Sequence, residues 1–126
     1  MDHKYNYPSQ YRLFFVKYHK AEYWEAHEVL EELWQTQREN HFYQGLIQIA
    51  AIMHQLERGK VRGAKKLAKS AIGHLTPFYP NYEEVDIAAV LKWLSNCFDQ
   101  LPEKVSTLDP EEVDRLGIKP CPLPTL

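Results

Sequence analysis

Residues 41–58 have the sequence HFYQGLIQIAAIMHQLER, which is apolar around most of the circumference of a helix. The narrow polar side of this helix carries Gln44, Gln48, Ala51 and Gln55. Asn40 precedes the segment and suits its N-cap, because an asparagine side chain accepts a hydrogen bond from the first helical turn. A helix with so broad an apolar surface has to be covered from several sides. We therefore expect residues 41–58 to form the central helix of a bundle.

Four further segments show the periodicity of helices with one apolar face, and they cover about residues 8–19, 21–37, 60–75 and 82–101. Gly59 suits the left-handed residue that ends the central helix, and it leaves only a short connection to the segment that follows. The helices on either side of Gly59 are therefore expected to form an antiparallel hairpin.

The last part of the chain has a helix signal of its own. Asp109 and Pro110 suit the cap and the first turn of a short helix, and Gly117 suits the position after its end. Beyond Gly117, prolines at every second position from 120 to 124 exclude both a helix and a central strand. We expect an extended tail there, and whether it docks on the bundle stays open.

These patterns predict an all-α fold: a compact up-and-down bundle of about five helices, with a short C-terminal helix, an extended tail and no sheet. A chain of 126 residues has the size of one domain, so residues 1–126 are taken as a single helical domain. The residues expected to be buried together in its core are His27, Leu30, Trp34, Leu46, Ile49, Met53, Leu67 and Ala71.

Composition excludes several classes of protein. With 44% hydrophobic and 25% charged residues the chain is typical of neither a disordered nor a membrane protein, and no apolar run reaches the roughly 18 residues of a membrane span. Residues 1–7 lack the apolar stretch of a signal peptide. Cys97 and Cys121 form no CxxC pair, so reduced thiols are expected. We expect a cytoplasmic protein with no membrane partner.

Two motifs identify a resemblance. Residues 25–34 have the sequence EAHEVLEELW and residues 42–51 the sequence FYQGLIQIAA, followed by Arg58-Gly59 and Gly63-Ala64. In these motifs and their order the chain resembles the bacterial family known as domain of unknown function 309. The resemblance covers about residues 11–76 and implies an all-helical fold, and it brings no established activity. The expected fifth helix and the tail, within residues 77–126, lie outside it.

The first motif contains a candidate polar cluster, composed of His27, Glu28, Glu31, Gln48 and His54. His27 and Glu31 lie one helical turn apart, and Glu28 flanks them. A metal ion would need a further ligand from another helix, and His54 of the central helix is the well-placed histidine. Neither HExxH nor the Glu-x-x-His of di-iron bundles occurs, so we assign no metal and no cofactor.

The structural interpretation of this cluster is favoured. A histidine on an apolar stripe is usually a core residue with a satisfied hydrogen bond, so we expect His27 to be shielded from water and bonded to Glu31, Gln48 or His54. A half-buried histidine beside a carboxylate also suits acid–base chemistry. The chain contains no recognisable nucleophile motif and no glycine-rich phosphate loop, so catalysis is unsupported rather than excluded.

Basic residues gather on the helix expected at 60–75. The basic patch comprises Arg58, Arg62, Lys66 and Lys69, and no acid lies between the first and the last of them. This patch suits phosphates or an acidic partner, and its sign is opposite to that of the acidic helix at 21–37. The helix lacks aromatic residues for base stacking and the whole chain has a net charge of −2, so we do not expect nucleic acid as a partner.

Two hypotheses about function remain. The first is a non-catalytic interaction or ligand-binding module with an aromatic-lined surface on helices 8–19 and 21–37, because eight tyrosines and three tryptophans favour binding surfaces. Its partner is an unknown protein, a small ligand or a second copy in a homodimer. The alternative is a small metal-assisted or acid–base enzyme centred on His27, Glu28, Glu31 and His54.

Overall fold

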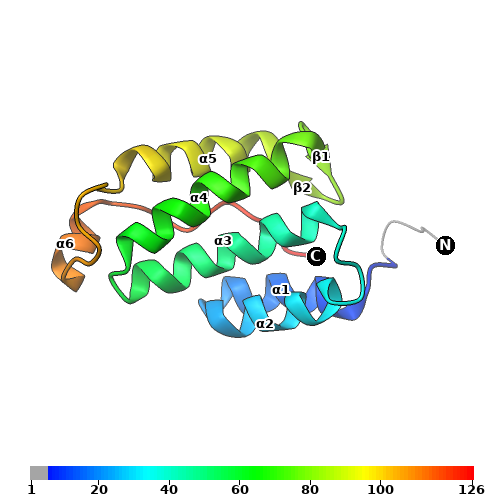
Figure 1. Cartoon of the computed structure of the whole chain (residues 1–126). Coiled ribbons are helices and arrows are strands. Elements are labelled where there is room, and N and C mark those ends of the chain that lie inside the picture. Colours follow the sequence, from blue (N-terminus) through cyan, green and yellow to red (C-terminus); the bar gives the residue numbers. More distant parts are fainter. Residues whose placement is uncertain (1–5) are drawn as a thin grey trace.

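The computed structural model describes residues 6–126. Five long helices form a bundle, and a short helix and an extended tail follow (Figure 1). The helices are α1 (Ser9–His19), α2 (Tyr23–Trp34), α3 (His41–Glu57), α4 (Val61–Leu75), α5 (Ile87–Gln100) and α6 (Pro110–Arg115), with a 3-10 turn over Thr76–Phe78. This confirms the all-α bundle with its short C-terminal helix and tail. The assignment of residues 1–126 to one domain stays a prediction, and residues 1–5 lie outside the described part.

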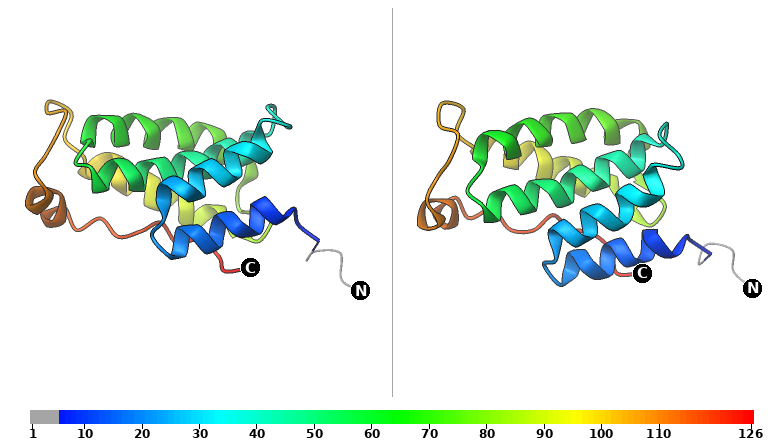
Figure 2. Two further views of the ribbon diagram at one scale, coloured as in Figure 1. Left: turned by 90° about the horizontal axis from the view of Figure 1, so that it is seen from below. Right: turned by 60° about the horizontal axis from the view of Figure 1, so that its bottom comes forward.

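Helix α3 lies between the α1–α2 hairpin and the pair formed by α4 and α5 (Figures 1 and 2). Its boundaries are those that local chemistry dictates. The side chain of Asn40 accepts a hydrogen bond from the Tyr43 N–H at 3.0 Å, and Gly59 has the left-handed φ of +69°. No helix within residues 6–126 is long and apolar enough to cross a membrane.

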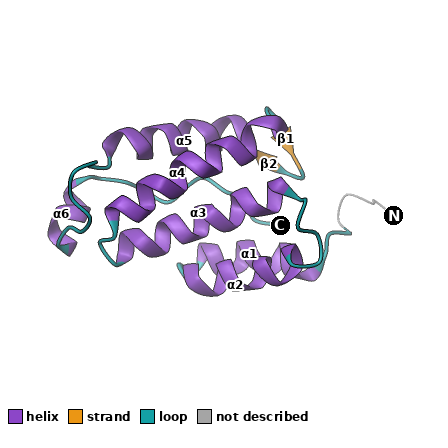
Figure 3. Ribbon diagram, in the orientation of Figure 1, coloured by secondary structure: helices purple, strands orange, loops and turns teal. Residues whose placement is uncertain are grey.

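The expectation of no sheet is wrong at one place. Strands β1 (Asn81–Tyr82) and β2 (Val85–Asp86) form an antiparallel hairpin, visible beside the start of α5 in Figure 3. Glu83 and Glu84 form its turn with φ of +47° and +71°, a conformation that glutamate rarely adopts. Strands of two residues are too short for periodicity to reveal. The hairpin also delays α5, which begins at Ile87 rather than at about residue 82 because the Asp86 side chain caps it.

The core is richer in aromatic residues than the sequence predicts. Tyr11, Phe14, Phe15 and Tyr18 of α1 are all buried. The expected aromatic surface on α1 and α2 is therefore mostly core, and Trp24 is its exposed remainder with 45% of its surface accessible. Five of the eight expected core residues are buried, namely Leu30, Leu46, Ile49, Met53 and Ala71. The other three, His27, Trp34 and Leu67, are half-buried at the edges of α2 and α4.

Close packing joins α3 to α4 at Gly45. A Cβ atom added at Gly45 would lie 2.5 Å from both Cγ and Cδ2 of Leu75, which is itself fully buried. Gly73 lies on the exposed side of α4, where an added Cβ meets nothing within 4 Å. Gly45 is thus required by close packing between α3 and α4, whereas Gly73 is not.

We predict opposite effects of alanine at these two glycines. Gly45→Ala forces Leu75 out of its site and should lower the free energy of unfolding by about 1–3 kcal/mol, as overpacked cores do. Gly73→Ala should raise it by up to about 1 kcal/mol, because alanine is the better helix former. Urea unfolding followed by circular dichroism measures both. Equal effects of the two substitutions would contradict the close contact.

Candidate functional site

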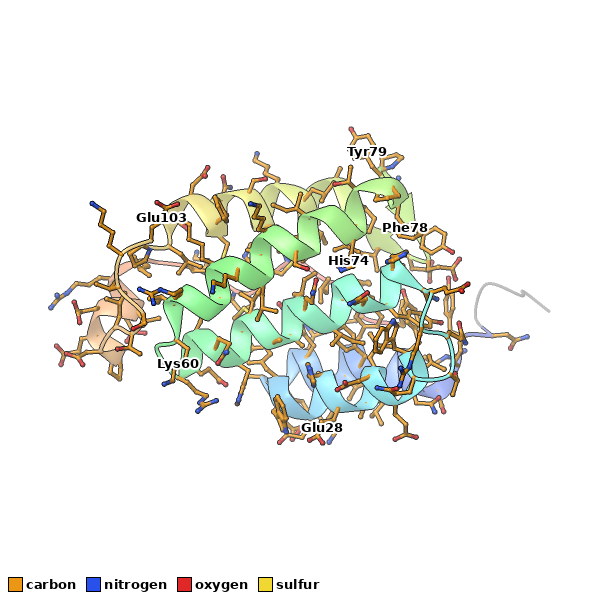
Figure 4. The ribbon with its side chains drawn as sticks, viewed as in Figure 1. Glu28, Lys60, His74, Phe78, Tyr79 and Glu103 are labelled. Carbon is orange, nitrogen blue, oxygen red and sulfur yellow. The ribbon has the colours of Figure 1, made fainter. Side chains whose placement is uncertain are left out.

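Helices α2, α3 and α4 lie side by side on one face of the bundle, with α3 in the middle, and we call this the α2–α4 face (Figures 1 and 4). His27 and Glu31 come from α2, Gln48 and His54 from α3, and Ser70 from α4. Their side chains meet between neighbouring helices. The polar side of α3 is thereby flanked by its two neighbours rather than open to solvent.

His27 lies near Glu31 as expected, at 3.5 Å between Nδ1 and Oε2. This contact is not a hydrogen bond. His27 Nδ1 is buried and has no hydrogen-bond partner among the described residues. The side chain of His27 is 18% exposed and that of Glu31 is 40% exposed. His27 is thus half-buried and close to Glu31, as predicted, but the predicted hydrogen bond between the two side chains is not formed. Glu28 is exposed on the outer side of α2 (Figure 4).

Trp24 connects His27 to His54. Its ring stacks on the His27 ring with centroids 4.7 Å apart and an interplanar angle of 9°, and its centroid lies 5.1 Å from that of His54. Trp24 was not predicted to belong to this cluster, although its position one turn before His27 is the signal that would have included it. The cluster is therefore built around an exposed indole ring.

The protonation of His27 follows from burial. Desolvation lowers the pKa of His27 below its ordinary value of 6.5, Glu31 and Glu28 act in the opposite direction, and His54 lowers it further. His27 is thus neutral at neutral pH, and its contact with Glu31 is not an ion pair there. A neutral imidazole can accept a proton at the ring nitrogen that carries no hydrogen.

Gln48 lies apart from His27. Its Nε2 donates to Ser70 Oγ at 2.9 Å, which directs the amide toward α4. The structure therefore divides the predicted cluster into a part at α2 and a part at α4. Within residues 6–126 no group of three or more histidine, cysteine, aspartate or glutamate side chains is arranged to hold a metal ion. His27, Glu31 and His54 do not converge on one point in this structure.

The basic patch borders a groove that no sequence pattern predicts. We call it the cationic groove; its volume is about 510 Å³ and its lining is Arg62, Lys65, Lys66, Lys69, Phe98, Pro102, Glu103 and Lys104. Three of the four predicted residues line it, and Arg58 does not. Phe98, Pro102 and Lys104 come 23 or more residues after Leu75, the last residue of α4, so no local pattern could place them.

One cation of the groove is held in place. Lys65 Nζ donates to the main-chain oxygen of Leu101 at 2.8 Å and lies 4.3 Å from the ring centroid of Phe98. The contact with the ring is in the range of a cation–π interaction. Arg62, Lys66 and Lys69 form no ion pair with any other described residue. They leave a concentrated positive charge beside apolar surface.

Comparison with known proteins agrees with the motifs. The model of the family described as "Domain of unknown function (DUF309)" matches residues 11–67, a segment that includes His27, Glu31 and His54. The "Uncharacterized protein YpuF" of Bacillus subtilis (strain 168) is 28% identical over 101 residues. That alignment covers 75% of this chain and 58% of YpuF, so the chain spans less than two thirds of this relative. No solved structure matches the chain.

The matched segment contains α2 and α3 with both motifs, and it stops within α4. Neither comparison names an activity. Over residues 11–67, which include α2, α3 and the first half of α4, the chain resembles the family of domain of unknown function 309.

Proposed function

We propose that the protein is a non-catalytic ligand-binding module and that its cationic groove binds a small anion. The observation that carries this proposal is the lining of the groove, in which five cationic side chains surround a hollow of about 510 Å³ with a single acid, Glu103. Cations of one sign around a concave surface raise the local concentration of anions. The volume lies in the range of small-molecule sites.

The apolar part of the lining favours a ligand that has an apolar surface as well as a negative charge. Phe98 and Pro102 are half-buried in the groove beside the cations. An anion with an apolar part would contact both. The face of Phe98 is occupied by Lys65, which leaves it unsuited to the base stacking that single-stranded nucleic acids use. A small phosphate-bearing compound therefore suits the groove better than a nucleic acid does.

A second candidate function rests on His27. Its Nδ1 is buried, unpartnered and 3.5 Å from a carboxylate oxygen, which is a geometry in which Glu31 stabilises the imidazolium after proton transfer. Acid–base catalysis at the α2–α4 face is the alternative that this observation favours. Elemental analysis of protein purified without an affinity tag tests the metal-assisted version of the same alternative.

We predict that charge reversal in the groove weakens anion binding. Lys66→Glu should raise the dissociation constant of inorganic triphosphate about tenfold or more, because it replaces a favourable contact of about 1.4 kcal/mol with a repulsive one. Lys92→Glu makes the same change of charge at an exposed site outside the groove and should have a much smaller effect. Isothermal titration calorimetry at low ionic strength measures both, and 0.15 M salt should weaken binding. Equal effects of the two variants, or no binding to the native chain, would refute the groove as a site.

We also predict how Glu31 affects His27. Because the Glu31 carboxylate raises the pKa of His27 against the effect of burial, Glu31→Gln should lower that pKa further. Glu32→Gln removes a carboxylate from the exposed side of the same helix and should leave the pKa nearly unchanged. Titration of the imidazole by nuclear magnetic resonance gives the value directly. A higher pKa in Glu31→Gln would exclude the electrostatic contact.

The same histidine should make stability depend on pH. The pKa of His27 is below 6.5 in the folded chain, so the unfolded chain binds more protons as the pH falls below about 6.5, and the free energy of unfolding decreases. His27→Leu should keep the fold and lose this component, giving a shallower decline between pH 7 and pH 5. Urea unfolding at a series of pH values is the measurement. Parallel curves for the two chains would show that His27 is not shielded from water.

A further inference from the structure

The tail after α6 lies along the bundle in an extended form. It is drawn as a loop in Figure 3, and Figure 2 shows it running from α6 past α5 to end beside α1. Cys121 is its buried residue, 2% exposed, while Leu123 and Pro124 are half-buried. The tail occupies a groove between two helices that are the first and the last of the bundle. We call this the α1–α5 groove.

Three side chains of the bundle hold the tail by its main chain. Trp93 Nε1 donates to the oxygen of Lys119 at 2.7 Å, and the hydroxyl of Tyr18 donates to the oxygen of Cys121 at 3.0 Å. His19 Nε2 lies 3.0 Å from the oxygen of Pro124, which can only accept. The acceptors are thus the main-chain oxygens of residues 119, 121 and 124. Because the bonds are made to the main chain, they do not depend on which side chains the tail carries.

The sequence of the tail matches this form of binding. Pro120, Pro122 and Pro124 have no N–H group, so their nitrogen atoms leave no donor unsatisfied in an extended segment. Proline-rich segments are recognised in the same manner elsewhere: aromatic side chains line a groove and donate to carbonyl oxygens, and the stiff segment loses little entropy on binding. Cys121 adds a small buried side chain between two exposed prolines.

The resident tail does not fill the groove. A hollow of about 360 Å³ lies beside Lys119 along Trp93 and Cys97 of α5. A second hollow of about 250 Å³ lies beside Thr125 and Leu126, along Phe15 and Val16 of α1, with Lys20 at its edge. A segment bulkier than residues 119–126 would therefore gain contacts that these residues do not make.

The tail also makes few contacts with the bundle. Five of the eight residues from 119 to 126 are exposed, and none of the described hydrogen bonds uses an N–H of residues 118–126. Segments with few buried contacts and few backbone hydrogen bonds open at low cost in free energy. The groove thus combines a built set of donors with an occupant that is easily released.

We infer that the α1–α5 groove is a receptor for proline-alternating peptide segments and that the tail is its resident ligand. The partner is a protein with an extended Pro-x-Pro-x-Pro segment, a small residue at the position of Cys121, and an apolar residue followed by an acidic one at the end that meets Val16 and Lys20. This site is separate from the cationic groove and does not depend on the function proposed there.

Thiol reactivity of the full chain tests the inference. In Cys97→Ser, Cys121 is the remaining thiol, and it is buried while the tail is docked. A synthetic peptide of residues 119–126 with serine in place of Cys121 should increase the rate of its reaction with an aromatic disulfide at least tenfold at millimolar concentration, since a tethered ligand competes at about that effective concentration. The same peptide with alanine for all three prolines should leave the rate unchanged.

Two further comparisons sharpen the test. Tyr18→Phe removes a donor to the tail and should raise the rate without peptide about threefold to tenfold, whereas Tyr23→Phe removes a hydroxyl that bonds no tail residue and should not. A peptide extended by Phe-Asp should act at a lower concentration than the parent peptide.

Three outcomes would overturn the inference: a rate independent of peptide up to several millimolar, equal effects of the proline and alanine peptides, or release of the tail into a concentration-dependent dimer seen by light scattering. A dimer would mean that the groove binds the tail of a second copy of this chain rather than a different protein. If Cys97→Ser does not fold, the native chain gives the same measurement, with labelled Cys121 separated from Cys97 by peptide mass spectrometry.

Discussion

The burial of α3 is the constraint on which the other elements depend. Its apolar residues point in nearly every direction, so no single neighbour could cover it, and the chain surrounds it with helices that come before and after it in sequence. The contact at Gly45 brings α4 close enough to exclude even a methyl group. The polar side of α3 therefore lies between α2 and α4. The candidate site forms there because these two helices cover the other sides of α3.

Local signals could be interpreted correctly from sequence because their causes lie within a few residues. Asn40 caps α3, Gly59 and Gly117 have positive φ, and the Glu112 side chain accepts from the Asp109 N–H at the start of α6. Each of these residues acts on its own backbone or on the next turn. The helical fold and the order of its elements follow from such signals together with apolar periodicity.

The features that sequence did not predict depend on distant partners. The hairpin at residues 81–86 is too short to have a pattern, and the lining of the cationic groove joins α4 to residues near 100. The proximity of His27 and Glu31 could be predicted because one helix fixes their spacing. The neighbour of Gln48 could not be predicted, since the rotation of α3 decides whether that amide meets α2 or α4, and packing rather than sequence sets that rotation.

The hydroxyl of Tyr18 and its acceptor on Cys121 are 103 residues apart, whereas the helices before the tail mostly pack on their neighbours in sequence. During synthesis on a ribosome, α1 to α4 can therefore assemble while the partner of Tyr18 has not yet been made, and closing so long a loop contributes its entropy cost last. Until then the buried aromatic face of α1 has an open flank. A nascent chain stalled after α5 would present that flank to chaperones, because the tail that packs against α1 would not yet have been made.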